Sequence, residues 1–369
     1  FRKIDLTNTV QFEYSKEQFK NDFIANNQII ETYQNNANLK ILNLFQENTL
    51  RYNFSKKIDL TATLNFQNTQ FNNNTFSTNL FLINPSIYFN IKKTGFGNFS
   101  FSFSENNSLP EINQLTTNFQ LTDYRSFLQG TTFQKPLKNQ TISLNYSYYN
   151  DEKRFSINTN IFYSNSKSIL NTSSNLTSDF NFNSYIQTKG NESYNFNFSL
   201  VNYSRKLKLA SKIETLNNWI TSPLNVNSTE FSNAKSYSNS IKYSATTYFK
   251  SKINFDFGFS YNYFQSNFQG IKTTNTTKDA FFNINYKVSK TILAESNNSL
   301  YYVNNKNYSF NNLVLSYTPL DSKFSYRLIL NNLVNENQYT SISINNYSYY
   351  QSIVQLVPRY VLGTIKYRF

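Results

Sequence analysis

The last ten residues, Tyr360 to Phe369, read Tyr-Val-Leu-Gly-Thr-Ile-Lys-Tyr-Arg-Phe. Every second position from Val361 onward is apolar or glycine, and the charged residues Lys366 and Arg368 fall between them. Successive side chains of a β-strand point to opposite faces, so this stretch predicts a strand with one apolar and one charged face. The last residues of a soluble domain are usually frayed and polar, whereas the last strand of a membrane barrel must pair and face lipid. The stretch therefore favours a membrane β-barrel over the alternative, an edge strand of a soluble protein.

The composition of the 369 residues narrows the chemistry that the chain can carry out. It contains 36 Phe and 29 Tyr but only 7 Gly, and it has no Cys, His or Met. The absence of cysteine excludes disulfides, thiolate metal sites and a lipoprotein anchor, and the absence of histidine removes the usual general base. We accordingly expect no metal site and no cofactor. The net charge of +14 comes from Lys and Arg scattered singly or in pairs at turns, so we expect no nucleic-acid partner.

Apolar residues alternate with polar ones along most of the chain, which argues against a disordered, prion-like segment. The clearest run, residues 253–263, alternates polar residues with Ile253, Phe255, Phe257, Phe259, Tyr261 and Tyr263. A spanning strand needs only about ten residues with every second one apolar. A mean hydropathy of −0.55 is therefore no obstacle to a membrane location. We expect Phe255, Phe257, Phe259 and Tyr261 to face outward, toward lipid.

Short basic turns alternate with long polar connections. We expect the turns at Lys56, Lys153, Lys206, Lys252 and Lys290. The long connections are expected at 105–138, 166–190, 217–236 and 333–357. Outer-membrane barrels have short periplasmic turns and longer loops outside, so the turns should share one rim and the loops the other.

The pattern as a whole predicts an all-β fold, a transmembrane antiparallel up-and-down β-barrel in the bacterial outer membrane, with residues 1–369 as one barrel domain. We count roughly seventeen strands, an odd number, whereas single-chain bacterial barrels use even ones. A turn expected at residues 15–21 makes the first strand run toward the periplasm, as the last one does. We therefore expect at least one strand before Phe1, which makes the chain the C-terminal part of a larger barrel.

The final strand also resembles the terminal signal of bacterial outer-membrane barrels, in which a Gly is followed by alternating apolar residues up to a final Phe. The residues that carry this resemblance are Gly363, Ile365, Tyr367 and Phe369. The resemblance implies that the outer-membrane assembly machinery recognises this strand.

Further residues resemble the barrel of TonB-dependent receptors. One connection of that family is similar to Leu109-Pro110, Gln114-Leu115, Gly130 and Lys135-Pro136. The chain departs from the pattern at Thr131-Thr132 and Leu137. Nearer the end, the elements that resemble the family are Asn332-Leu333, Asn335, Tyr339 and the approach to the last strand, Gln355-Leu356-Val357-Pro358-Arg359.

This resemblance implies a barrel of roughly 22 strands, whose N-terminal plug and first strands, roughly five, are absent here. It implies import of a bulky nutrient (a metal chelate, an oligosaccharide or a peptide) with energy from TonB, which contacts the missing N-terminal part. The implied partners are outer-membrane lipid and lipopolysaccharide, TonB, the assembly machinery and a surface substrate-binding lipoprotein. The alternatives are a structural barrel subunit of a larger outer-membrane assembly, a passive porin and an outer-membrane enzyme.

No catalytic motif appears, since the seven glycines are too dispersed for a nucleophile elbow, a P-loop or a dinucleotide fingerprint. We therefore expect the chain not to be an enzyme. The carboxylates that fall opposite the apolar face are Asp5, Glu13, Asp59 and Asp256. The polar lining of a wet lumen explains them better than paired acid/base catalysis. Two interpretations stay open for aromatic residues of the last long connection, contact with substrate and contact with the membrane interface: Tyr347, Tyr349 and Tyr350.

Overall fold

The computed structural model describes residues 3–25, 28–73, 77–133, 135–228, 230–303, 306–320, 322–344 and 349–368. In this part of the chain almost every segment is a β-strand, and the helical elements are two short 3-10 turns, η1 (Glu31–Tyr33) and η2 (Ile112–Leu115). No helix of the described residues is long and apolar enough to cross a membrane. The sequence-based prediction of an all-β, antiparallel up-and-down fold of the outer-membrane barrel class is confirmed.

The strands divide into two compact units, which are described separately. Unit 1 comprises Phe1–Tyr146, Asn160–Asn195 and Trp219–Lys235, and unit 2 comprises Ser147–Thr159, Phe196–Asn218 and Ser236–Phe369. The elements within unit 1 are β1 (Lys3–Asn21), β2 (Ile24–Ala25), β3 (Gln28–Ile29), η1, β4 (Asn35–Ser55), β5 (Ile58–Asn73), β6 (Ser77–Thr94), β7 (Gly97–Ser108), η2, β8 (Phe119–Asp123), β9 (Ser126–Gln129) and β12 (Asn181–Thr188).

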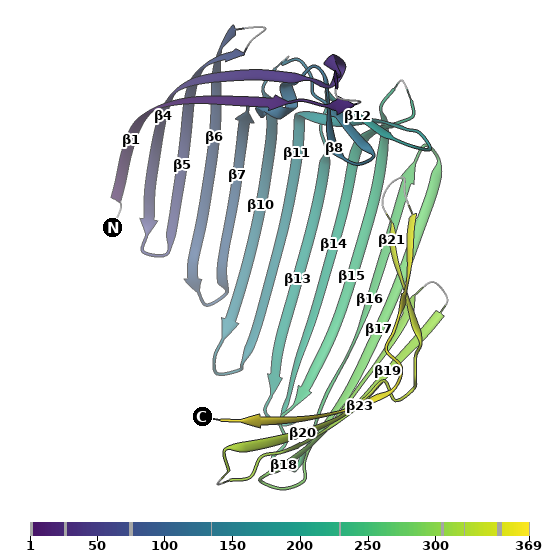
Figure 1. The fold of residues 1–369 in the computed structure, drawn as a ribbon. Helices are drawn as coiled ribbons and strands as arrows, with labels where there is room; N and C mark the ends of the chain where they lie inside the picture. The colour runs from purple at the N-terminus through teal and green to yellow at the C-terminus, as the bar shows by residue number, and fades with distance from the viewer. Residues whose placement is uncertain are drawn as a thin grey trace. The chain divides into compact units, whose positions relative to one another are not determined.

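Both units contain parts of five long strands, and the remaining strands belong to unit 2. Figure 1 labels the five shared strands. The five shared strands are β10 (Leu137–Asn150), β11 (Phe155–Leu176), β13 (Glu192–Ser204), β14 (Leu209–Val226) and β15 (Ser232–Thr247). Those of unit 2 are β16 (Ile253–Phe268), β17 (Ile271–Lys287), β18 (Ile292–Val303), β19 (Lys306–Tyr317), β20 (Phe324–Asn331), β21 (Gln338–Ile344), β22 (Tyr349–Gln355) and β23 (Tyr360–Tyr367).

The first strand is longer than the sequence analysis predicted. β1 pairs with β4 in one unbroken antiparallel register, from Lys3 opposite Asn53 to Asn21 opposite Asn35. The turn expected at residues 15–21 is therefore wrong, as is the spanning strand expected after it. The polar side chains at 15–18 misled the prediction, because a β-ladder is held by backbone hydrogen bonds and tolerates them. The first strand consequently runs in the direction opposite to the expected one.

In unit 1 the strands have one apolar and one polar face, as predicted. On β1 the side chains of Ile4, Leu6 and Phe12 are 61%, 78% and 65% exposed. Between them, Asp5 and Glu13 point to the other face, because neighbouring residues of a strand alternate. The sheet thus presents uncovered apolar side chains on one side and polar ones on the other.

In unit 2 the same two faces are present on β16 and β17. Phe259 on β16 is 51% exposed, and Phe282 on β17 is 46% exposed and stacks on Phe255 with ring centroids 5.7 Å apart. Phe257 is directly opposite Phe282, so the aromatic residues expected to face outward do share the exposed apolar face.

Opposite these rings, on the polar face, Gly258 is overlain by a phenylalanine of the next strand. A Cβ atom on this residue would lie 2.7 Å from Phe281 Cε1 and 2.5 Å from the Tyr243 carbonyl oxygen. Only glycine fits under the Phe281 ring, which explains one of the few glycines within a strand.

The short basic turns lie side by side along one edge of each unit, here called the turn edge. In unit 1 the Lys92 N–H donates to the Lys57 carbonyl. In unit 2 a backbone N–H of one turn likewise donates to a backbone carbonyl of its neighbour. These bonds run from Tyr203 to Arg154, Tyr248 to Lys208, Lys287 to Lys252, Thr318 to Thr291 and Arg368 to Lys323. Within each unit the prediction that these turns share a rim is confirmed.

The opposite, loop edge carries fewer long loops than expected. Residues 166–176 and 217–226 continue β11 and β14, and β16 meets β17 through the tight turn Gln269-Gly270. Both turn residues have positive φ, 50° and 80°, as a two-residue hairpin turn requires. The stretches rich in Asn, Ser and Thr, which suggested loops, instead continue the paired strands beyond the apolar part of the sheet.

Candidate functional site

In unit 1 the connection after β7 folds back onto the polar face of the sheet. Its 3-10 turn η2 ends at Leu115, which is 7% exposed and packs in a small core with Leu39 (1%) and Phe71 (0%). Leu39 and Phe71 belong to β4 and β5 and point to the polar face near the loop edge. These apolar residues interrupt the polar face, and covering them gives the connection a fixed position.

Gly130 allows this connection to close on itself. The Thr131 N–H donates to the Gln114 carbonyl at 2.8 Å. A Cβ atom at Gly130 would lie 2.4 Å from the Thr116 carbonyl oxygen and 2.6 Å from that of Gln114. The side chains of Gln114 and Glu111 also cap η2 reciprocally. Gln114, Leu115 and Gly130, quoted above for their resemblance to a receptor family, therefore have structural roles here.

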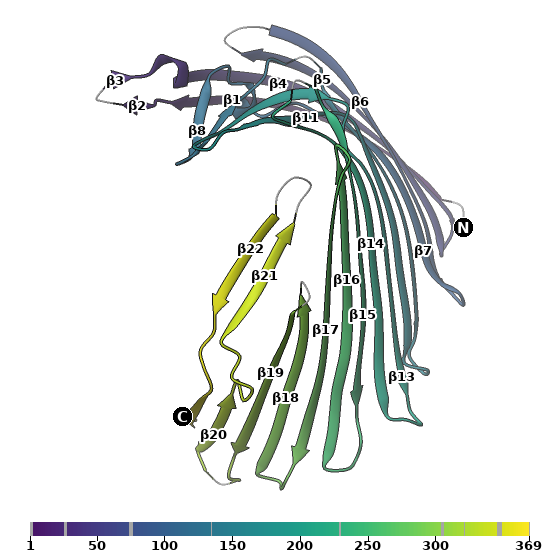
Figure 2. The ribbon, with the colours of Figure 1, turned by 90° about the vertical axis from the view of Figure 1, so that its right-hand side faces the viewer.

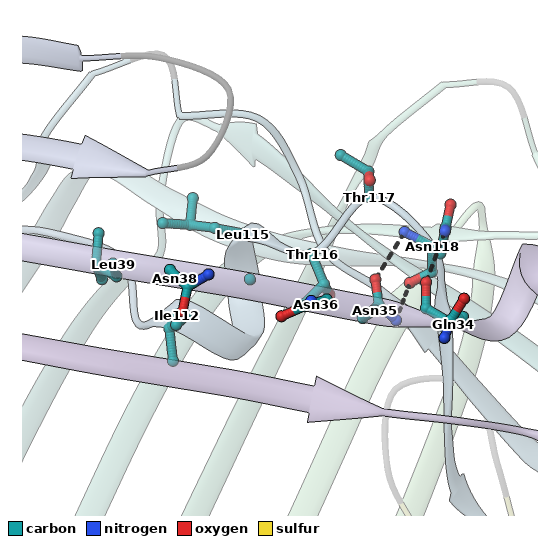
Figure 3. A pocket seen from close by; sticks show the side chains of 11 residues that line it. Gln34, Asn35, Asn36, Asn38, Leu39, Ile112, Leu115, Thr116, Thr117 and Asn118 are labelled. Carbon is teal, nitrogen blue, oxygen red and sulfur yellow. Dashed lines mark hydrogen bonds between the residues drawn. The ribbon is translucent and has the colours of Figure 1, made fainter.

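A recess of about 230 Å³ lies between the start of β4 and this connection (Figure 3). Its lining consists of amide, hydroxyl and apolar side chains: Gln34, Asn35, Asn36, Ala37, Asn38, Leu39, Ile112, Leu115, Thr116, Thr117 and Asn118. None of these residues is charged. A ligand bound here would meet hydrogen-bond donors and acceptors but no ionic partner.

Two asparagine amides hold the recess together. Asn35, which is 5% exposed, donates through Nδ2 to the carbonyls of Asn118 (3.2 Å) and Phe119 (3.4 Å) and accepts from the Asn118 N–H (3.1 Å). In return, Asn118 Nδ2 donates to the carbonyls of Gln34 (2.8 Å) and Glu31 (3.3 Å). Figure 3 shows the two side chains reaching toward each other from opposite sides. The bonds join segments 83 residues apart in the chain.

One other lining side chain is available to a ligand. The hydroxyl of Thr117 makes no hydrogen bond with the described residues, and Thr117 is exposed. A hydroxyl can both donate and accept a hydrogen bond. With the amides and hydroxyls around it, Thr117 suits a neutral ligand that carries hydroxyl or amide groups.

An aromatic cluster beside the recess stabilises the loops around it. Phe127 is 6% exposed and lies 5.1 Å from Tyr33 and 5.2 Å from Phe182, ring centroid to ring centroid. Phe119 also contacts Tyr33 and Phe182. Because these rings mostly cover one another, they form a local core and not an open stacking platform.

Arg125 fastens a second connection to this cluster. Its guanidinium donates to the carbonyls of Ser178 and Asp179, and its own carbonyl accepts from the Asn181 N–H at 2.8 Å. The Arg125 N–H donates to Asp123 Oδ1 at 2.8 Å and holds the pKa of that carboxyl below its usual value. The loops that frame the recess are thus tied by directional bonds.

In unit 2 the β21–β22 hairpin lies along the polar face of β18 and β19 (Figure 2). Tyr339 packs there against Tyr301, Tyr308 and Phe310, with its ring centroid 5.1 Å from that of Tyr308. At the hairpin base, Asn332 Nδ2 donates to the carbonyls of Glu336 (2.8 Å) and Val357 (3.0 Å). This connection, expected to extend outward, folds back because its aromatic residue covers the tyrosines of the sheet.

The tyrosines considered as substrate contacts have different outcomes. Tyr347 lies outside the described residues. Tyr349 pairs with Ile344 at the start of β22, and Tyr350 is 70% exposed next to it. Tyr349 and Tyr350 belong to unit 2, whereas the residues of the recess belong to unit 1. Their role in binding remains a prediction.

Three residues of the terminal signal, Gly363, Ile365 and Tyr367, lie on β23, which pairs with β20. Gly363 is opposite Leu328, Ile365 opposite Tyr326 and Tyr367 opposite Phe324, so they continue the apolar face of that strand. Ile365 is 68% exposed. Phe369 lies outside the described residues.

The four carboxylates singled out from the sequence are dispersed. Asp59 pairs with Lys92 at 2.8 Å, Asp5 with Lys3 at 3.3 Å, and Asp256 accepts from Asn285 Nδ2 at 3.0 Å. Glu13 lies opposite Asn43 in the β1–β4 ladder. Among the described residues no group of three potential metal ligands is close enough to hold an ion. None of these acids reaches the recess.

The recess residues Asn35, Asn38, Thr117 and Asn118 were not predicted from the sequence. Asparagine is so frequent in this chain that no single position stands out. The one usable signal was the Gln114-Leu115 and Gly130 pattern, which marked the connection but not its partner on β4.

No known protein-family model and no curated protein matches the chain. Similar solved structures include OmpT of Vibrio cholerae, an outer membrane protein in its trimer form, with 11% identity, 98% of this chain and 99% of that chain covered, and a TM-score of 0.30. They include the siderophore receptor PiuA of Acinetobacter baumannii, which is 11% identical with a TM-score of 0.30. That match covers 98% of this chain and 72% of the receptor chain. They also include the ferric-catecholate import receptor Fiu of E. coli K12, which is 9% identical with a TM-score of 0.28. That match covers 98% of this chain and 80% of the receptor chain. At these values the similarities assign neither a family nor an activity.

The location follows from the arrangement of the strands themselves. In lipid, backbone groups must be paired internally, and a sheet that spans the membrane turns apolar side chains outward and polar ones inward. The long antiparallel hairpins, their exposed apolar face and their short basic turns meet these requirements. The chain is an integral outer-membrane protein.

The expectation that the chain is not an enzyme is corrected. That expectation rested on the absence of catalytic motifs. It is overturned by the similar solved structures, because several of them are structures of OmpT and not of receptors. Because one scaffold hosts unrelated activities through its loops and sites, an enzymatic activity is open for this chain.

Replacing Asn35 with alanine should loosen the connection over the recess. The change removes three hydrogen bonds and leaves the N–H of Asn118 without its acceptor, at a cost of about 1–3 kcal/mol. Hydrogen exchange at residues 112–120 should accelerate at least fivefold. Asn38→Ala, which removes an amide without a described protein partner, is the matched control and should leave this exchange unchanged. Equal exchange in the Asn35 variant would contradict the assigned role.

Proposed function

We propose that this chain is the barrel of an outer-membrane receptor of the TonB-dependent type, which binds a bulky nutrient from outside and imports it. The observation that carries the proposal is the recess of unit 1, built by a connection that folds onto the polar face and is held by Asn35 and Asn118. A passive pore does not need a binding surface that hydrogen bonds hold in a fixed position. The Gln114-Leu115, Gly130 and Asn332 positions, which resemble that family, support the proposal because each holds a connection in place.

Among the nutrients such receptors import, a neutral oligosaccharide fits the recess best. Metal chelates and peptides commonly carry charge, and no charged side chain lines the recess. Sugar hydroxyls both donate and accept, which matches the Thr117 hydroxyl. A volume of about 230 Å³ would accommodate one end of such a chain, and the loops would hold the rest.

The proposal includes several partners. TonB would supply energy through a segment that is not part of this sequence, and a surface lipoprotein would deliver substrate to the loop edge. The assembly machinery would recognise β23 and the residues after it, and lipopolysaccharide would surround the apolar face at the loop edge.

Binding by the protein from the intact gene tests this function. Calorimetric titration with a panel of neutral glucose, xylose and mannose oligosaccharides should give micromolar binding to at least one of them. The Thr117→Val variant should weaken it at least fivefold, and a ferric trihydroxamate chelate should not bind. Uptake of the bound sugar by cells should stop when TonB is removed. Chelate binding alone, unchanged affinity in the Thr117 variant, or uptake without TonB would contradict the proposal.

A further inference from the structure

A gap interrupts the apolar face of unit 2 where β18 crosses it. Two rows of paired residues run across the strands there: Ile284, Ser296, Leu313 and Leu330 form one, and Tyr286, Ala294, Leu315 and Leu328 the other. In each row the β18 residue is small and its neighbours are large. The result is a groove of about 330 Å³ on the face that turns to lipid. Pockets of roughly 300–1,000 Å³ are the usual size for small-molecule ligands.

The groove lies within the depth of one lipid leaflet. At its turn-edge end, the Tyr317 and Tyr326 rings stack with centroids 6.0 Å apart, and tyrosines are typical of the membrane–water interface. At its other end, Asn298 Oδ1 accepts from Asn311 Nδ2 at 2.7 Å. At about 3.4 Å per residue and a tilt of about 40°, the stretch from Ile292 to Asn298 covers about 15 Å of depth, half of a hydrocarbon core of about 30 Å.

A basic band borders the groove at the turn edge. The turns 250–252, 287–291 and 318–323 contain Lys250, Lys252, Lys287, Lys290 and Lys323, against one carboxylate, Asp321. Backbone bonds hold these turns side by side, from Lys287 to Lys252 and from Thr318 to Thr291. In the described part of the chain no ion pair involves these lysines. Their charge is thus available to an anionic headgroup at the level where a lipid phosphate lies.

We propose that this groove and band form a binding site for one anionic glycerophospholipid of the turn-edge leaflet. An acyl chain would lie along β18 over Ala294 and Ser296, and the phosphate would lie at the level of Lys287, Lys290 and Lys323. Buried apolar contact would hold the chain, and charge would select the headgroup. This inference does not depend on the proposed import function.

Native mass spectrometry of the full-length protein, released from detergent with added lipid, tests the site. With dioleoyl phosphatidylglycerol and dioleoyl phosphatidylethanolamine at equal concentration, one phosphatidylglycerol should be retained with at least fivefold preference. Ala294→Leu with Ser296→Leu, which fills the groove, should lower its occupancy at least fivefold. Lys287→Gln with Lys290→Gln and Lys323→Gln should abolish the preference between the two lipids.

Two matched controls separate the site from general lipid contact. Ala62→Leu introduces a leucine at a small residue on the apolar face of β5, and Lys153→Gln with Lys206→Gln removes charge from other turns. Both should retain phosphatidylglycerol as the native protein does, and heat-modifiable gel mobility verifies that every variant is folded. Equal retention of both lipids by the native protein would overturn the proposal, as would native-like retention by the groove-filled variant. Preferential retention of lipopolysaccharide or of another protein at the groove would also overturn it.

Discussion

Replacing Phe282 with arginine should destabilise the protein by about 2–4 kcal/mol in lipid vesicles, because the new charge would lie on the lipid-facing side of β17. Phe282 is 46% exposed and stacks on Phe255 within the apolar face. Water cannot follow the guanidinium into the hydrocarbon, so its lost hydration raises the free energy of the folded state. An effect of this size is a roughly 30- to 1,000-fold change in the unfolding equilibrium constant at about 1.4 kcal/mol per tenfold change.

The neighbouring residue provides the control. Asn283 points to the polar face, where it lies opposite Asp256, so Asn283→Arg adds the same side chain next to a carboxylate and water. The substitution also removes the hydrogen bond from the Asn298 N–H to Asn283 Oδ1 (3.2 Å), so its effect on the guanidinium-induced unfolding of the vesicle-bound protein should stay within about 1 kcal/mol. Equal destabilisation by both variants would mean that the two faces do not differ in environment.

Replacing both Tyr367 and Phe369 with aspartate, or deleting Phe369, should reduce the assembled barrel at least tenfold while synthesis continues. Ile365 and Tyr367 continue the apolar face of β20, and Tyr367 lies 4.9 Å from the Phe324 ring. An aspartate near the membrane interface costs less than the ~2–4 kcal/mol of a basic residue at the midplane. Lipid burial alone therefore predicts a mild effect, and a severe loss would indicate recognition by the assembly machinery.

Lys366→Asp is the matched control for this experiment, because it places the same carboxylate on the polar face of the same strand. It should assemble as the native protein does. Heat-modifiable gel mobility and protection from surface protease report the folded barrel. Native levels of barrel in the Tyr367/Phe369 variant would show that these residues are not a signal.

The apolar faces were predictable from the sequence because they depend on local alternation alone. Residues 253–263 repeat an apolar residue at every second position, and the first strand does so with one exception, Asn8. The structure places these apolar residues on one face of each strand. The basic turns were equally local, since each occupies a few residues between two alternating runs. A strand with one face in lipid needs an apolar side chain at every second position, so lipid contact accounts directly for this two-residue period.

The extent of the strands was less predictable, because Asn, Ser and Thr are common in both loops and ladders. The stretch 166–176 continues β11 although its side chains suggested a loop. Likewise, Ser15 to Gln18 pair with β4 in an unbroken register, and this reverses the expected direction of the first strand. Backbone hydrogen bonds decide whether such a stretch joins the sheet, and they form whether its side chains are polar or apolar.

The candidate site was not predictable because its contacts are distant in sequence. Asn35 bonds to Asn118 across 83 residues, and Leu115 packs on Leu39 and Phe71 of two other elements. No periodicity marks these pairs. Only Gln114-Leu115 and Gly130 marked this connection in the sequence, and they did not indicate its partners on the sheet.

The central claim is that the aromatic face of these strands contacts lipid and the opposite face contacts water. A single-cysteine scan of residues 254–262 tests it most directly, because the chain has no cysteine of its own and each introduced thiol carries the only nitroxide label. Relaxation by molecular oxygen, which concentrates in lipid, should peak at the positions of Phe255, Phe257, Phe259 and Tyr261. Relaxation by a water-soluble nickel chelate should peak at the residues between them. Profiles without a two-residue period, or with the two reagents exchanged, would contradict the account.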